Sequence, residues 1–366
     1  MKKKVIFIIN SMDIGGAEMI LSQILPYLKK KYDVRVVTLK DINSLNVSIH
    51  PLLKIKKHPV IFFPIYFFKI MKIKFSERPY KVISFLEYSN FLNILTSINP
   101  VIFFCTNLSY FSYFRGIRGQ IYKLLIIFLY PFAKKIIVNS QQNKIDLGRK
   151  IFFDINKLDV IYNPLDVDKI QKLSLENIDP EISMKLKNKT VFVTLGRLDR
   201  CKRVDVLVKG FYNLSLENKN LVLIIIGSGP EQDNIKDLIS KLSLEDNVFL
   251  LGKQNNAIKY LKQANYFIYN SRVEGFPSVL LEATALGLPI ITVDFKSGAR
   301  ELIDPELNFD EVINYPYYGP NGVLLGIDNF EQDILKVNLN RLTQKQKGMD
   351  KFLLNNVVRG WEQLIN

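Results

Sequence analysis

The chain has 366 residues, 48% hydrophobic and 23% charged, so it is globular rather than disordered and long enough for two domains. Two cysteines and two histidines exclude a disulfide framework and a four-cysteine zinc site, and they leave little for a histidine-based metal centre. Residues 1–150 contain 24 Lys and Arg against 7 Asp and Glu, an excess of 17 that points to a polyanionic surface, either nucleic acid or anionic lipid.

The first predicted element is a buried strand at residues 5–9, a continuous apolar run typical of a parallel sheet. Gly15 and Gly16 follow, then a helix to about residue 30 and a strand at 34–39. The glycine pair lets the backbone approach a ligand at the carboxyl end of the first strand. A plain glycine turn before a helix is an equally good interpretation.

Aromatic residues and lysines are mixed in residues 51–78, a composition that suits either a membrane interface or a buried helix with solvated lysines. Both interpretations stay open there, whereas for residues 110–135 a buried helix is favoured. No apolar run reaches the ~20 residues of a membrane span, and we expect no signal peptide. The membrane-contact candidates are Phe62, Phe63, Phe67, Lys69, Lys72 and Lys74.

Strands at 81–85, 101–105 and 135–138 complete a first doubly wound sheet. A second domain is predicted from strands at 190–195, 221–226, 248–251, 266–269 and 290–293. Residues 308–320 are interpreted as a local insertion of unknown role, and residues 351–364 as an amphipathic helix.

A basic loop follows the strand at 190–195. In it, Arg197 can hold a diphosphate through two parallel hydrogen bonds, and Lys202 can add a point charge. Two solvated surface cations are the alternative.

The stretch 271–283 carries the strongest functional signal. Gly275 and Pro277 turn the chain after a strand, and Ser278 can cap a helix whose N-terminus suits a phosphate. Glu274 then lies beside that phosphate, and Glu282 can accept hydrogen bonds from a diol. Phosphate, diol and a second polyol together describe a nucleotide sugar.

Two glutamates eight residues apart around Gly-Phe-Pro, with Arg197 and Lys202 after an earlier strand, resemble the retaining glycosyltransferases of family 4. The resemblance implies the α/β GT-B fold, with two Rossmann-like domains (1–168 and 169–348) facing a cleft and a last helix (349–366) returning to the first domain. It implies catalytic roles for Arg197, Lys202 and Glu274. The donor-binding positions that it implies are Gly15, Gly16, Gly196, Gly227, Gly252, Lys253, Gly275, Phe276, Pro277, Ser278, Val279 and Glu282.

The resemblance further implies transfer of a sugar, with N-acetylhexosamine as the best guess, from a UDP-sugar to a polyprenyl-diphosphate-linked glycan. Such an enzyme retains the anomeric configuration, needs no metal or cofactor, and works peripherally on the cytoplasmic face of the inner membrane. The family often has a histidine after the strand that ends near Cys105, where this chain has Thr106 and Asn107 as weak acceptor-side candidates. Asp166 and Asp168 form a D-x-D string that binds metal in another glycosyltransferase fold, but here it follows a proline turn and is assigned none.

Two other classes remain as alternatives. A GT-B UDP-hexosamine epimerase would use the same nucleotide contacts. Such an enzyme would be favoured by an acidic first domain with its own histidines and carboxylates, and the sequence shows no such domain. A nucleic-acid-binding protein would explain the basic first part, but its cations are mixed with aliphatic residues and no binding motif occurs. We therefore expect no nucleic-acid partner.

Overall fold

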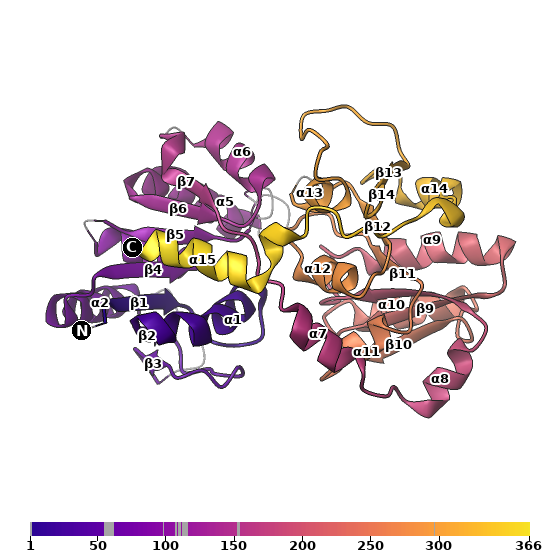
Figure 1. Ribbon diagram of the computed structural model, residues 1–366, viewed down its shortest axis with the longest axis horizontal. Coiled ribbons are helices and arrows are strands. Elements are labelled where there is room, and N and C mark those ends of the chain that lie inside the picture. Colours follow the sequence, from indigo (N-terminus) through magenta and orange to yellow (C-terminus); the bar gives the residue numbers. More distant parts are fainter. Residues whose placement is uncertain are drawn as a thin grey trace. The chain divides into compact units, whose positions relative to one another are not determined.

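The computed structural model describes residues 2–54, 62–97, 99–106, 108, 111, 116–151, 154–295 and 297–366. The chain forms two compact α/β units, Met1–Pro164 with Lys351–Asn366, and Leu165–Asp350 (Figure 1). These boundaries lie within a few residues of 168 and 348. Each unit is a Rossmann-like layer of parallel strands between helices, the α/β architecture that the sequence predicts.

The first unit contains a parallel sheet with the strand order β3-β2-β1-β4-β5-β6-β7. Its strands are β1 (Lys4–Ile9), β2 (Asp33–Thr38), β3 (His50–Pro51), β4 (Lys81–Phe85), β5 (Val101–Phe104), β6 (Lys135–Val138) and β7 (Leu158–Val160). Its helices are α1 (Gly16–Lys31), α2 (Phe63–Glu77), α3 (Glu87–Leu95), α5 (Gly116–Leu129), α6 (Gln141–Lys150) and α15 (Leu354–Ile365).

Alternate residues of these strands point to opposite faces, so the sheet has a core on each side. Helices α1 and α15 cover the face that carries Phe7 and Phe85, whereas α2, α3 and α5 cover the face that carries Ile8 and Phe104. Trp361 of α15 is fully buried and stacks on Phe85 with ring centroids 5.5 Å apart. The prediction that the last helix returns to the first domain is thereby confirmed.

The structure corrects the membrane-contact candidates on α2. Phe62, Phe63 and Phe67 are partly buried and pack against the core, because they lie on the side of α2 that faces the sheet. Lys69 is exposed, but its ammonium donates to the Leu52 carbonyl at 2.6 Å. Lys74 donates hydrogen bonds to α3 and to the loop that follows it. Of the three candidate lysines, Lys72 alone is exposed without a hydrogen bond to the described residues.

The second unit has the strand order β10-β9-β8-β11-β12-β14-β13, parallel except for the antiparallel pair β13 and β14. Its strands are β8 (Thr190–Leu195), β9 (Leu221–Ile226), β10 (Val248–Gly252), β11 (Tyr266–Tyr269), β12 (Ile290–Val293), β13 (Tyr317–Gly319) and β14 (Gly322–Leu325). Its helices are α7 (Val167–Ser174), α8 (Pro180–Leu186), α9 (Val204–Glu217), α10 (Gln232–Lys241), α11 (Ile258–Leu261), α12 (Ser278–Ala285), α13 (Ala299–Ile303) and α14 (Phe330–Asp333).

Candidate active site

The predicted donor-binding residues of the second unit gather at one edge of its sheet. Parallel strands β8 to β12 end at the same edge, so the loops that follow them are neighbours there. Open α/β sheets bind ligands at this carboxyl edge. The fold therefore brings together segments that lie about eighty residues apart in the sequence.

Backbone contact between two loops explains one of the predicted glycines. Gly227 has φ +138°, and a Cβ atom placed on it would lie 1.8 Å from the Gly196 carbonyl oxygen. The two loops are joined by backbone hydrogen bonds, including Leu198 N–H to the Ser228 carbonyl at 3.0 Å. Gly227 is thus required for the close approach of the loops after β8 and β9, and a donor contact is not needed to explain it.

The basic loop after β8 is held by an aspartate that the sequence did not single out. Asp199 accepts from the Arg197 side chain at 2.5 and 2.8 Å and from the backbone N–H of Cys201 at 3.0 Å. Arg197 stays 67% exposed, so its guanidinium remains accessible to a ligand while Asp199 restrains it. The loop is also tied to the segment after β11, because Arg272 N–H donates to the Cys201 carbonyl at 2.8 Å.

Lys202, Glu274 and Tyr269 form a compact triad at this edge. The Lys202 ammonium contacts the Glu274 carboxylate directly and donates to the Tyr269 hydroxyl at 2.7 Å. The Tyr269 hydroxyl in turn donates to Glu274 Oε1 at 2.7 Å. Two of the three residues were predicted to be catalytic, but nothing in the sequence indicates that they touch.

The triad has a defined charge state. Burial by itself lowers the pKa of Lys202, but the charge of Glu274 and the Tyr269 hydroxyl outweigh this and hold the pKa above its ordinary value. Burial, with the Glu274 charge, raises the pKa of Tyr269 well above its usual range. Lys202 is therefore a fixed cation and Tyr269 a neutral donor at physiological pH.

We expect Tyr269→Phe to reduce kcat about tenfold with a smaller change in the donor KM. The hydroxyl positions both Lys202 and Glu274, and its loss leaves each with one hydrogen bond fewer in a partly buried place. A pH–rate profile on the basic side tests the role, because Lys202 then loses one of the interactions that raise its pKa. An unchanged kcat with an unchanged profile would show that Tyr269 only fills space.

The turn before α12 is tied to the loop after β12. Phe276 is buried, and Gly298, with φ +60°, leaves room for its ring: a Cβ there would lie 2.4 Å from it. Ser297 Oγ donates to the Glu274 carbonyl at 2.5 Å. Helix α12 begins at Ser278 itself, so the N-cap residue is Pro277, whose side chain makes no capping hydrogen bond. The prediction that Ser278 is the N-cap of this helix is therefore wrong.

Glu282 lies in α12, one turn beyond Ser278, and its carboxylate has no hydrogen bond among the described residues. Burial raises its pKa to about 7, and the nearby charge of Lys169 opposes only part of that effect. A partly buried, unpaired carboxylate at a ligand-binding edge is in position to accept hydrogen bonds from a polyol.

The raised pKa predicts a stability penalty that substitution should remove. A carboxyl whose pKa is about 4.5 unfolded and about 7 folded loses stability as pH rises through this range, on the order of 3 kcal/mol. Without ligand, Glu282→Gln should therefore unfold at a higher temperature than wild type at pH 8 and at nearly the same temperature at pH 4.5. Thermal unfolding at both pH values measures this, and an equal difference at both would contradict the assignment.

The remaining predicted positions are more scattered. Lys253 is exposed after β10, where Gly252 turns the chain with φ +65°, and Val279 lies in the first turn of α12. Gly15, Gly16 and Thr106 follow β1 and β5 at the carboxyl edge of the first sheet. Asn107 lies outside the described residues.

Metal-ligating side chains do not gather in the part of the chain that the structure describes, which contains no group of three or more His, Cys, Asp or Glu close enough to hold an ion. Asp166 of the D-x-D string instead caps α7, accepting from Lys169 N–H at 3.0 Å.

Two Rossmann-like units, the second with a basic, glycine-rich carboxyl edge, define the GT-B class of glycosyltransferase. Family models agree: Glycosyltransferase Family 4 matches residues 14–169, and Glycosyl transferases group 1 matches residues 176–310. The chain belongs to the family 4 glycosyltransferases.

Among its relatives is the N-acetylgalactosamine-N,N'-diacetylbacillosaminyl-diphospho-undecaprenol 4-alpha-N-acetylgalactosaminyltransferase of Campylobacter jejuni, 31% identical over 96% of this chain and 96% of that protein. An uncharacterized glycosyltransferase of Methanocaldococcus jannaschii is 33% identical over 82% of this chain and 74% of its own length. The crystal structure of Anabaena HepE in complex with UDP and glucose superposes with a TM-score of 0.74, 17% identity and 99% coverage of both chains.

Proposed function

We propose that this glycosyltransferase moves an N-acetylhexosamine from a UDP-sugar to a glycan linked to polyprenyl diphosphate, with retention of anomeric configuration and without a metal ion. It works at the cytoplasmic face of the inner membrane, attached peripherally. The single observation that carries the proposal is the fixed Lys202–Glu274–Tyr269 triad at the carboxyl edge of β8 and β11, with Arg197 on the same loop as Lys202.

Each part of that edge suits one part of the donor. Arg197 and Lys202 offer the positive charge that a leaving diphosphate requires, which in other sites a metal ion supplies. Glu274 accepts from a hydroxyl of the donor sugar, and Glu282 accepts from the ribose diol. As the sugar–phosphate bond breaks, the acceptor hydroxyl attacks from the same face, and its proton passes to the leaving phosphate oxygen.

The acceptor and the nucleotide are supported by comparison. The Campylobacter relative is named as a transferase acting on a diphospho-undecaprenol substrate, and it aligns along nearly the whole of both chains. HepE, which shares the fold, was crystallised with UDP and glucose. The hexosamine donor proposed for this chain is based on the name of the first relative, and the proposed uridine on the complex of the second protein.

A donor screen tests the proposal. UDP at a hundred times its dissociation constant should add about 2.7 kcal/mol of stability, visible as a rise in unfolding temperature. UDP and UDP-N-acetylhexosamines should stabilise the protein, GDP should not, and excess chelator should leave the rate of transfer unchanged. Stabilisation by GDP alone would reject the donor, and loss of activity in chelator that manganese restores would reject metal independence.

Exposed apolar side chains on the first unit support membrane attachment. Ile117, Ile121, Leu124 and Phe128 of α5 are each more than half exposed, and their spacing places them along one stripe of the helix. Helix α2, on the same face of the sheet, exposes Phe68 and Phe75. The described helices include none with the length and apolar content needed to cross a bilayer. An amphipathic surface among many cations suits an anionic membrane.

We expect the triple variant Ile121→Gln, Leu124→Gln, Phe128→Gln to bind anionic vesicles at least tenfold more weakly than wild type. The three side chains would otherwise bury apolar surface in the interfacial region, a contribution that salt does not screen. A matched control replaces Leu175, Met184 and Leu216, three exposed apolar residues of the second unit, by Gln. Vesicle sedimentation that fails to separate the two variants would rule out α5 as the membrane surface.

A further inference from the structure

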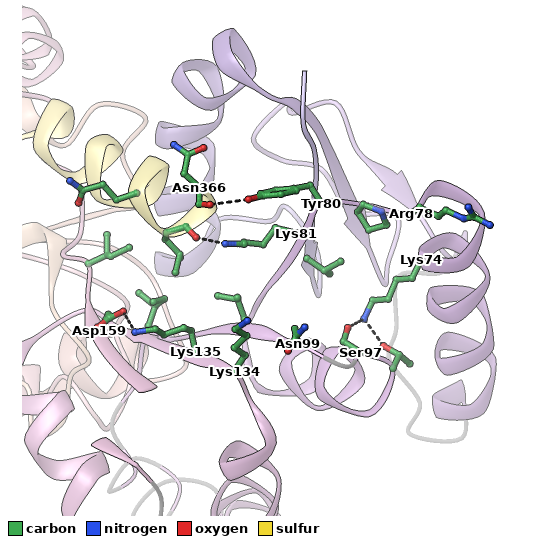
Figure 2. A pocket seen from close by; sticks show the side chains of 18 of the residues that line it. Lys74, Arg78, Tyr80, Lys81, Ser97, Asn99, Lys134, Lys135, Asp159 and Asn366 are labelled. Atoms are coloured by element: carbon green, nitrogen blue, oxygen red, sulfur yellow. Dashed lines mark hydrogen bonds and ion pairs between the residues drawn. The ribbon is translucent and has the colours of Figure 1, made fainter. Parts of the chain in front are cut away.

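A cavity lies in the first unit, away from the carboxyl edge of its sheet. Its volume is about 1260 Å³, and its walls come from β4, β5 and β6 near their amino ends, from β7, from the C-terminal part of α2, from the loop after α3 and from the end of α15 (Figure 2). Because the strands are parallel, Gly15, Gly16 and Thr106 lie at the opposite edge. The cavity is therefore separate from the edge at which sugar transfer is expected.

The cavity is strongly basic. Among the described residues that line it, the charged side chains are Lys74, Arg78, Lys81, Lys134 and Lys135 against Asp159. Lys135 pairs with Asp159 at 2.7 Å, which neutralises one cation. Figure 2 shows the Arg78 side chain directed away from Lys81 and Lys134, so Arg78 lies at the margin.

Lys81 and Lys134 have no carboxylate partner among the lining residues. Lys81 donates to the Leu364 carbonyl at 2.5 Å, and its pKa is lowered by burial and by the positive charges of Lys134 and Lys3. Lys81 begins β4 and Lys134 immediately precedes β6, and these two strands flank β5, so the backbones that carry the lysines are about 10 Å apart. Two long cationic side chains at that separation can reach the same phosphate group.

Lys74 adds a buried amine without a counter-ion. Its ammonium donates to Asn93 Oδ1 at 2.9 Å and to Thr96 Oγ1 at 2.6 Å, and it also contacts the Ser97 hydroxyl. All three acceptors are neutral, and burial lowers the pKa of Lys74 to about 7. An anion in the cavity would supply the negative charge that the protein leaves out.

The rest of the lining mixes polar side chains, among them Thr96, Asn99 and Gln363, with apolar ones. Met71 and Phe75 stand exposed at the α2 side, and Val82, Val101 and Ile137 line the sheet side. A ligand that fills the cavity therefore combines a negative group with an apolar part.

We propose that this cavity binds a phosphate-bearing amphiphile, with its phosphate between Lys81 and Lys134 and its apolar part along Met71 and Phe75. Either the headgroup of an anionic phospholipid or a free phosphorylated molecule has this chemistry. The site is distinct from the donor edge of the second unit, and its occupation anchors or regulates the enzyme without taking part in the reaction.

Calorimetric titration of the full-length protein with dihexanoyl phosphatidic acid, below its critical micelle concentration, tests the site. UDP is kept saturating so that the donor edge is occupied. The double variant Lys81→Gln, Lys134→Gln should bind at least tenfold more weakly than wild type, and the glutamine amide that replaces the Lys81 ammonium retains a donor for the Leu364 carbonyl. The matched control Lys29→Gln, Lys30→Gln removes two exposed cations of α1 and should bind within twofold of wild type.

Two further probes fix the chemistry. Dihexanoyl phosphatidylcholine should bind far more weakly than phosphatidic acid, because its headgroup carries no net charge. Inorganic pyrophosphate that binds as tightly as phosphatidic acid would identify a free phosphorylated molecule as the source, and weaker binding would identify a lipid. Equal affinity of both double variants, or no binding by wild type, would overturn the site. If the double variant does not fold, the single variant Lys134→Gln, at an exposed position, replaces it in the titration.

Discussion

Lys202→Ala is expected to lower kcat by at least about a hundredfold, the effect of removing one fixed electrostatic group from a site where charge develops. Lys202 is held by Glu274 and Tyr269, and its raised pKa keeps it charged across the working pH range. Arg197→Ala should act in the same direction with little cost to stability, because that side chain is 67% exposed. Steady-state transfer rates measure both.

The matched control is Lys209→Ala, which removes an exposed cation from α9 in the same unit and should leave kcat within twofold of wild type. Because Lys202→Ala leaves Glu274 without its ion-pair partner, its unfolding temperature is measured alongside, and Lys202→Arg provides a variant that keeps the charge. Turnover of a folded Lys202→Ala protein within about threefold of wild type would remove Lys202 from the mechanism.

Glu274→Gln is expected to reduce transfer about a hundredfold while leaving the dissociation constant of UDP within about threefold of wild type. Its carboxylate is assigned to the donor sugar, which UDP lacks, and it also orients Lys202. Glu282→Gln should instead weaken UDP, because Glu282 is assigned to the ribose. Titration of both variants with UDP separates the two roles.

The two variants control for each other, since each removes one carboxylate charge from the same edge of the second unit. If both lose UDP affinity equally, the division between sugar and ribose is wrong. If Glu274→Gln transfers sugar at the wild-type rate, the triad does not act on the donor.

Most of the sheet architecture could be predicted because its central strands are continuous apolar runs. Those at 81–85, 135–138, 190–195, 221–226, 266–269 and 290–293 coincide with the observed strands. The edge strands β3 and β7 were missed, because they are two and three residues long and partly exposed, so they carry no apolar run. Strand β13, three residues long and partly exposed, fell in the presumed insertion, whereas β14 is a buried apolar run beside it that was missed.

The candidate site could be predicted only in part. Arg197, Lys202 and Glu274 stand out because charged residues follow apolar strands. Tyr269 does not stand out, because a tyrosine at the end of a buried strand looks like a core residue. Its role is visible only from the hydrogen bonds that its hydroxyl makes in the structure.

The aromatic residues of α2 show another limit of the sequence. Aromatic residues occur on all sides of this helix, so the sequence does not show which side faces the sheet. That side is set by the residues that α2 packs against in the folded unit. Phe62 and Phe67 therefore pack, partly buried, against the core, whereas Phe68 and Phe75 are exposed.

The most direct test of the central claim is the anomeric configuration of the product formed from a UDP-α-N-acetylhexosamine and a glycan linked to polyprenyl diphosphate. The one-bond and three-bond couplings of the new anomeric proton report it by nuclear magnetic resonance. We expect an α-linked sugar, formed at the same rate with excess chelator present. A β-linked product, or no transfer from any UDP-hexosamine, would contradict it.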